Sequence, residues 1–88
     1  MLFPMPAPAA VRVLLFARYA DLLGNGEVSV PLPEPPTVAL VIQAVRALPG
    51  GHALPARPLV AVNARQARDA DLVAAGDEVA FLPPMAGG

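Results

Sequence analysis

The sequence predicts a small α+β domain in which one helix packs on one face of a four- to five-stranded mixed sheet. One segment repeats apolar residues at helical spacing, and four others alternate apolar and polar residues between Gly- and Pro-rich turns. The elements follow in the order β β α β (β) β with no internal repeat, an order typical of α+β domains. At 88 residues, 56% apolar but only 5% aromatic, the chain can build one core, mostly of Val, Leu and Ala.

The first strand is expected over residues 11–18, VRVLLFAR. Its alternation directs one set of side chains toward the core, namely Val11, Val13, Leu15 and Ala17. The other face receives Arg12, Leu14, Phe16 and Arg18. An apolar Leu14–Phe16 pair on the wetter face indicates a candidate contact surface.

A turn is expected next, through Gly24 to Gly26, followed by a second strand over residues 27–32. Val28 and Val30 would point inward in that strand. Pro31 marks it as an edge strand or as the end of one, because proline cannot donate to a sheet ladder.

The helix is expected over residues 37–48. Thr37 is a natural N-cap, and Pro49-Gly50-Gly51 ends the pattern. The apolar stripe that would face the sheet consists of Val38, Val41, Ile42, Val45 and Leu48.

Two further strands are expected, over residues 58–63 and 78–83, with a short strand, a turn or a single helical turn between them. In the last strand Val79 and Phe81 share one face, and Ala80 and Leu82 share the other.

Composition excludes several kinds of function. The net charge is −1, and the six basic residues are scattered arginines, which argues against a nucleic acid or an anionic membrane as partner. There is no Cys, and the single His52 lies in a loop, so neither a thiolate site nor a histidine base is expected. Four acidic residues near the last strand lack the spacing of a calcium loop and are expected to begin that strand after a turn; they are Asp69, Asp71, Asp77 and Glu78. We therefore expect no metal, no bound cofactor and no active site within the chain itself.

Residues 1–10 are expected to form a flexible Pro-rich leader, residues 11–82 the domain and residues 83–88 an extended tail. The leader lacks the positive region of a signal peptide, and no run approaches the roughly 18 apolar residues of a membrane span. The expected location is the cytoplasm.

The tail carries the most specific chemical signal. Pro83 and Pro84 would stiffen the exit from the last strand, and Gly87-Gly88 makes a thread slim enough for a narrow pocket in another protein. The reactive group at its tip would be the Gly88 carboxylate, which needs activation, for example as an acyl adenylate formed by a partner that binds ATP. The chain would then be a carrier on which other proteins act.

Three segments, VRVLLFARYADLLG, LVAVN and AGDEVAFLPPMAGG, resemble the small, sulfur-carrying subunit of molybdopterin synthase. The resemblance covers residues 11–88 and implies a ubiquitin-like β-grasp fold. It also implies that an E1-like enzyme adenylates Gly88 with ATP and that sulfur then replaces one oxygen to give a thiocarboxylate. The thiocarboxylate would donate its sulfur to cyclic pyranopterin monophosphate in the large synthase subunit, within a heterotetramer, to build the molybdopterin dithiolene.

By the same resemblance, Gly88 bears the sulfur, Gly87 permits threading, and the arm consists of Pro83, Pro84, Met85 and Ala86. Phe16 and Leu82 fall at positions of a hydrophobic sheet surface that binds both partners, and the strand alternation adds Leu14 to it. Gln66 stands where the family often has an apolar contact.

Three other interpretations remain open. A sulfur carrier of the thiamine pathway shares the fold and the diglycine, although the double proline favours the molybdopterin branch. A ubiquitin-like modifier would join Gly88 to lysines of target proteins. A small binding domain with a frayed end is the third.

Overall fold

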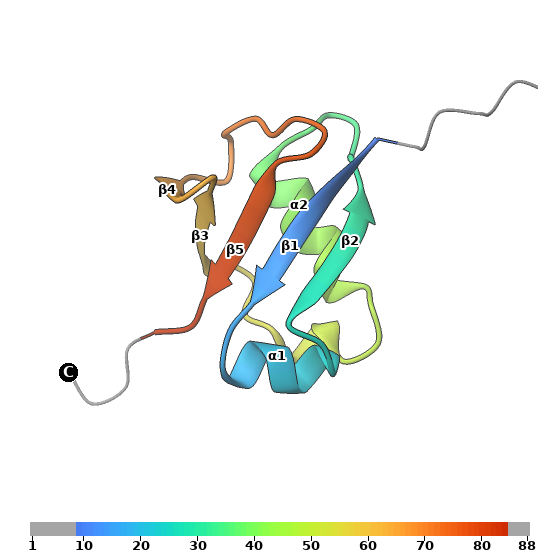
Figure 1. Cartoon of the computed structure of the whole chain (residues 1–88), viewed down its shortest axis with the longest axis vertical. Coiled ribbons are helices and arrows are strands. Elements are labelled where there is room, and N and C mark those ends of the chain that lie inside the picture. The colour runs from blue at the N-terminus through green and yellow to red at the C-terminus, as the bar shows by residue number, and fades with distance from the viewer. Residues whose placement is uncertain (1–8, 85–88) are drawn as a thin grey trace, which may run out of the picture.

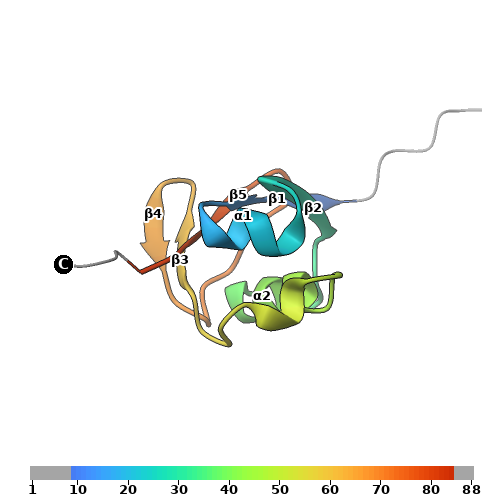
Figure 2. The same cartoon turned by 90° about the horizontal axis from the view of Figure 1, so that it is seen from below.

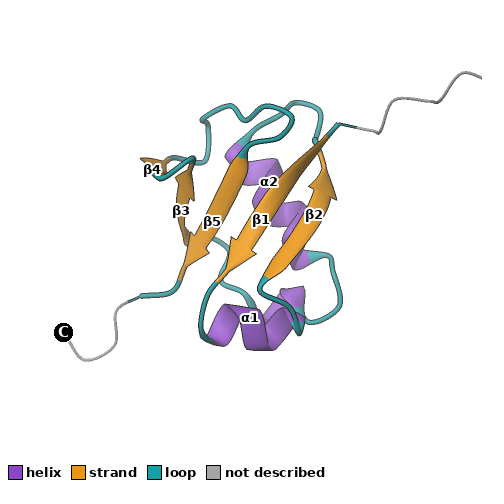
Figure 3. Ribbon diagram, in the orientation of Figure 1, coloured by secondary structure: helices purple, strands orange, loops and turns teal. Residues whose placement is uncertain are grey.

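The computed structural model describes residues 9–84, which form a five-stranded mixed sheet with one main helix on one of its faces (Figures 1 and 3). The strands are β1 (Ala10–Leu15), β2 (Glu27–Pro31), β3 (Leu59–Val62), β4 (Arg65–Ala67) and β5 (Glu78–Leu82). The helices are α1 (Arg18–Leu23), α2 (Val38–Arg46) and the 3-10 helix η1 (Gly51–Ala53). The strand order is β2-β1-β5-β3-β4, with β1 and β5 parallel and the other pairs antiparallel. The predicted α+β class is confirmed.

The core lies between α2 and the inner face of the sheet, and the view in Figure 2 shows α2 on that side only. Val79 and Phe81 of β5 are completely buried, as are Val11 and Val13 of β1. The helix contributes its predicted stripe, of which Val38, Val41, Ile42 and Val45 are buried. Burial therefore follows the predicted alternation in the two central strands and the predicted spacing in the helix.

The start of α2 is confirmed at its cap. The Leu40 N–H donates to Thr37 Oγ1 at 3.3 Å, which satisfies one of the free amides of the first turn. The helix ends at Arg46, two residues before the predicted end. Leu48 still packs against the core, although it lies beyond the helix.

The first strand is shorter than predicted, because the chain leaves the sheet after Leu15. Ala17 has a φ of +50° and is exposed, so its expected inward position is wrong. Helix α1 then forms over residues 18–23, where no helix was predicted, and the expected turn at Gly24 to Gly26 follows it. The α1 side chains Tyr19, Leu22 and Leu23 reach the core at helical spacing.

Two smaller differences concern residues 64–77 and the start of β1. Within residues 64–77 the chain forms β4 and turns but no helical turn. At the other end, β1 begins at Ala10, and the Leu32 N–H donates to the Ala9 carbonyl at 3.0 Å, so residues 9 and 10 belong to the domain rather than to the leader. No helix in the described part of the chain has the length and apolar character that a membrane span requires.

Candidate partner-binding site

Strand β5 leads the chain out of the middle of the sheet. It pairs with β1 on one side and with β3 on the other, and its last residue, Leu82, is followed by the half-buried Pro83 and the exposed Pro84. Neither proline has an N–H, so the strand cannot continue beyond Leu82. The other predicted tail residues, Met85, Ala86, Gly87 and Gly88, lie outside the described residues.

The sheet face opposite α2, here called the outer face, is apolar at the end where β5 exits. Leu59 and Leu82 are direct neighbours across β3 and β5, and in the next row Ala80 lies between Leu14 and Ala61. Phe16 directly follows β1 beside this row. We call this set the apolar patch: Leu14, Phe16, Leu59, Ala61, Ala80 and Leu82.

Two side chains of the apolar patch project strongly into solvent. Phe16 is 45% exposed and Leu59 is 48% exposed. Isolated exposed apolar residues are ordinary, but a contiguous exposed apolar group is typical of a protein contact surface. The predicted residues Leu14, Phe16 and Leu82 thus lie together, whereas Leu59 was missed. The alternation in PLVAVN, which buries Val60 and turns Leu59 outward, could have identified Leu59 as exposed but not as a neighbour of Leu82.

The outer face is charged around Arg12, and Glu27 of this charged group lies directly beside Leu14 of the apolar patch across β1 and β2. Arg12 Nη2 donates to Glu78 Oε2 at 3.0 Å, and Arg12 Nη1 lies 3.9 Å from Glu27 Oε1. All three side chains are about half exposed, so these pairs stabilise the fold little. Because these charged side chains gather around Arg12, a partner that buries apolar surface would dock at the end of the outer face where β5 exits.

Two adjoining hollows surround the exit of β5 at the edge of the apolar patch. The first, of about 280 Å³, is lined by Arg18, Tyr19, Leu22, Ala53, Pro55 and Pro84. The second, of about 330 Å³, shares Tyr19, Pro55 and Pro84 with the first. It adds Arg57, Pro58, Leu59 and Leu82. We call the two hollows together the exit groove.

The start of β5 is held by a hydrogen-bond network around Asp77. Asn63 Nδ2 donates to Asp77 Oδ1 at 3.0 Å, and the Ala74 N–H donates to Asp77 Oδ2 at 2.8 Å. The Glu78 N–H in turn donates to Asn63 Oδ1 at 3.0 Å. The hydrogen bond from Asn63, followed by that from Ala74, lowers the pKa of Asp77 below its ordinary value. The acidic residues here lie where a turn ends and the last strand begins, as expected.

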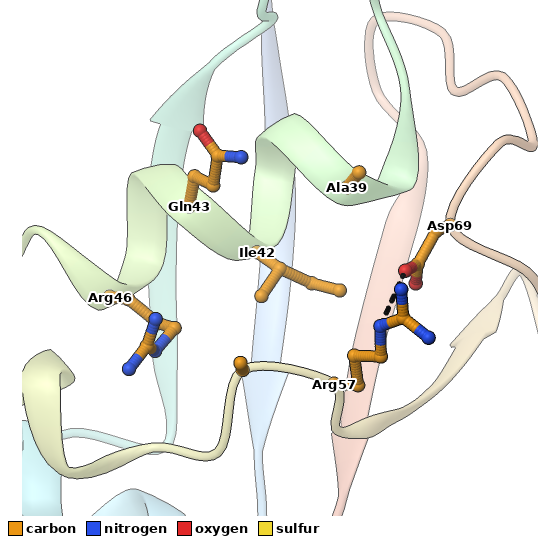
Figure 4. A pocket seen from close by; sticks show the side chains of 7 residues that line it. Ala39, Ile42, Gln43, Arg46, Arg57 and Asp69 are labelled. Atoms are coloured by element: carbon orange, nitrogen blue, oxygen red, sulfur yellow. Dashed lines mark ion pairs between the residues drawn. The ribbon is translucent and has the colours of Figure 1, made fainter.

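A third hollow lies on the helix side of the sheet, away from the tail. In Figure 4 Ile42 forms its centre, with Arg46 on one side and the Arg57–Asp69 ion pair on the other. The nitrogen and oxygen of that pair, Arg57 Nε and Asp69 Oδ2, are 3.6 Å apart. Within residues 9–84 no three His, Cys, Asp or Glu side chains lie close enough to hold a metal ion, and His52 is exposed.

The fold and the exposed apolar sheet end define a small ubiquitin-like β-grasp protein. The chain belongs to the ThiS family of sulfur carriers, whose family model matches residues 13–88. Among solved structures it is similar to SAMP1, the small archaeal modifier protein 1, from Haloferax volcanii. The identity to SAMP1 is 30% over 90% of this chain and 99% of that one, with a TM-score of 0.78.

It is also similar to a Pyrococcus furiosus protein described as molybdopterin converting factor subunit 1. The identity is 25% over 88% of this chain and 99% of that one, and the TM-score is 0.73. The comparison with curated proteins finds no match. These similarities confirm the β-grasp fold and the sulfur-carrier family.

Proposed function

We propose that this chain is the sulfur carrier of molybdenum cofactor biosynthesis, the small subunit of molybdopterin synthase. The observation that carries the proposal is the position of β5. This strand contributes Ala80 and Leu82 to the apolar patch and then leads, through Pro83 and Pro84, to the diglycine. A partner bound at the patch therefore lies beside the base of the tail. The likeness to the P. furiosus subunit supports this pathway within the ThiS family.

In the proposed reaction the Gly88 carboxylate attacks the α-phosphate of ATP on an E1-like enzyme, and pyrophosphate leaves. A sulfur donor then displaces AMP, so that one carboxylate oxygen is replaced by sulfur. The large subunit next binds the carrier, the thiocarboxylate sulfur forms a bond to cyclic pyranopterin monophosphate, and water then cleaves the bond between this sulfur and the Gly88 carbonyl carbon, which returns Gly88 to a carboxylate. In this scheme the chain supplies the terminal carboxyl group, a narrow backbone and a docking surface, while the partners supply the catalytic groups.

The apolar patch accounts for docking to both partners in turn. Because Phe16 and Leu59 are each about half exposed, they offer surface that only a complex would remove from water. A single surface used by two enzymes also makes their binding mutually exclusive, so the charged carrier must leave the first enzyme before it meets the second.

The second candidate function is protein modification, in which Gly88 forms isopeptide bonds with lysines of other proteins. The similarity to SAMP1, a modifier by name, favours it. Both functions begin with the same adenylation and separate only at the fate of the activated carboxyl group.

Intact mass spectrometry tests the proposal. The chain is incubated with ATP, the E1-like enzyme and a sulfur source, and the control omits ATP. The expected result is exchange of one oxygen for sulfur, followed by reversal when the large subunit and cyclic pyranopterin monophosphate are added. An unchanged mass would refute the carrier function. Adducts on lysines of other proteins would favour the modifier, and sulfur transfer in a thiazole-forming system instead would favour the thiamine pathway.

A further inference from the structure

The exit groove combines apolar walls with a few polar side chains. Its walls are apolar, chiefly Pro55, Leu59 and Pro84, and its polar groups are hydrogen-bond donors. Arg18 lines the first hollow and Arg57 the second, and no acidic residue in the described part of the chain lines either one. Such a groove complements an apolar side chain that is accompanied by carboxylates.

Tyr19 adds an independent observation. Its side chain is only 4% exposed and lines both hollows. Its hydroxyl makes no hydrogen bond with any of residues 9–84. In this part of the chain every completely buried side-chain oxygen or nitrogen has a hydrogen-bond partner, so the Tyr19 hydroxyl is not completely buried. The hydroxyl therefore reaches the surface of the groove, and none of the described residues uses its hydrogen-bonding capacity. A buried ring with a free hydroxyl is a common anchor of protein interfaces.

The groove is also continuous with the site already described. Leu59 and Leu82 belong both to the apolar patch and to the second hollow, so a partner seated on the patch reaches the groove without a gap. Pro84 lines both hollows, and the four residues that follow it can span about 13 Å when extended. An occupant of the groove would thus touch the base of the tail within that distance of Gly88.

We propose that the exit groove binds a segment of the adenylating enzyme that carries an apolar side chain flanked by carboxylates. This inference rests on the proposed function and names the chemistry of the partner at that site. The apolar side chain enters between Leu59 and Pro84, and the carboxylates pair with Arg18 and Arg57. The existing partner of Arg57 does not prevent this, because its ion pair with Asp69 is 3.6 Å long and Arg57 is 86% exposed. Contact with Pro84 then fixes the direction in which the tail leaves the domain.

The test measures thiocarboxylate formation by the adenylating enzyme as a function of carrier concentration. For Arg18→Glu and Arg57→Glu we expect KM to rise about tenfold each with kcat nearly unchanged, because a lost charge-assisted hydrogen bond is worth roughly this factor. Tyr19→Phe is expected to raise KM about threefold without changing the unfolding transition, since the hydroxyl bonds to no described residue of the free domain. The matched control is Arg65→Glu, a charge reversal on β4 outside both hollows, which should behave like the unmodified chain.

The outcomes separate the two proposals. If the unmodified chain receives no sulfur, the proposed function fails. If it does receive sulfur but Arg18→Glu and Arg57→Glu keep their KM within twofold, the function stands and the groove is not a binding site. An equal loss in Arg65→Glu would also overturn the inference, because the effect would then come from net charge.

Discussion

Replacement of Phe16 by alanine should weaken partner binding without weakening the fold. Phe16 is 45% exposed, is not part of the hydrophobic core, and directly follows β1 at the end of the sheet where β5 exits. An aromatic side chain buries about 150–250 Å² in total, so a complex can remove roughly another 70–110 Å² of Phe16 from water. At about 25 cal/mol per Å² this contact is worth about 2–3 kcal/mol. The expected loss of affinity is roughly 30- to 100-fold.

Isothermal titration calorimetry of the carrier with the E1-like enzyme measures this loss, and urea denaturation measures the stability. Leu72→Ala is the matched control, because Leu72 is 71% exposed but lies in the loop before β5, away from the apolar patch. It should bind like the unmodified chain. Both variants should keep their free energy of unfolding within about 0.5 kcal/mol.

Two results would refute this reasoning. If Phe16→Ala binds as tightly as Leu72→Ala, the apolar patch does not include Phe16. If Phe16→Ala instead lowers the free energy of unfolding by about 2 kcal/mol or more, Phe16 supports the core and its effect on binding says nothing about a contact.

Three further predictions concern the turn before β5, the end of α2 and the tail. Asp77 has a lowered pKa, so its charged form stabilises the fold at neutral pH, and this stabilisation is lost as the pH falls below 3.8 toward the pKa of the folded state. Asp77→Asn should therefore lower the free energy of unfolding, measured by urea denaturation, by about 1 kcal/mol at pH 7 and should weaken its dependence on acid pH. Gly51→Ala should cost more than about 2 kcal/mol, because its Cβ would lie 2.1 Å from the Val45 carbonyl oxygen, whereas Gly76→Ala meets open space and should cost only about 1 kcal/mol for its positive φ; a smaller loss for Gly51 than for Gly76 would contradict this. Gly88→Ala should unfold like the unmodified chain yet transfer sulfur at least about tenfold more slowly in a mass assay, because a methyl group at the reacting residue misplaces the carboxyl group; an unchanged rate would show that the site is not narrow.

The central strands and the main helix could be predicted because burial imposes their periods directly on the sequence. Val79 and Phe81 must face the core if the chain is extended, and the stripe from Val38 to Val45 must face it if the chain is helical. Helix α1 could not be predicted in the same way. Six residues are too few for a stable isolated helix, so α1 depends on tertiary contacts such as the burial of Tyr19, which the local sequence does not report.

The residues of the candidate site likewise divide into those that strand alternation predicts and those that depend on the folded structure. Alternation alone placed Leu14, Phe16 and Leu82 away from the core, but it could not say that Leu59 joins them. That neighbour relation depends on β5 lying between β1 and β3, which is a property of the sheet order. The exit groove was further beyond reach, because Tyr19, Pro55 and Pro84 come from three distant segments and meet only in the folded domain.

Under the proposed carrier function, the placement of β5 explains how the domain can orient a reaction at its terminus that the partners catalyse. Because β5 pairs on both sides and its inner residues are completely buried, the base of the tail follows a strand that is firmly held in the sheet. The same strand contributes Leu82 to the apolar patch, and Pro84 follows it into the exit groove. Docking at the patch would therefore fix the origin and direction of the tail up to Pro84, so that the partner needs to position only the residues beyond it. Fewer residues to order means a smaller entropic cost of bringing the carboxyl group to the reacting atoms.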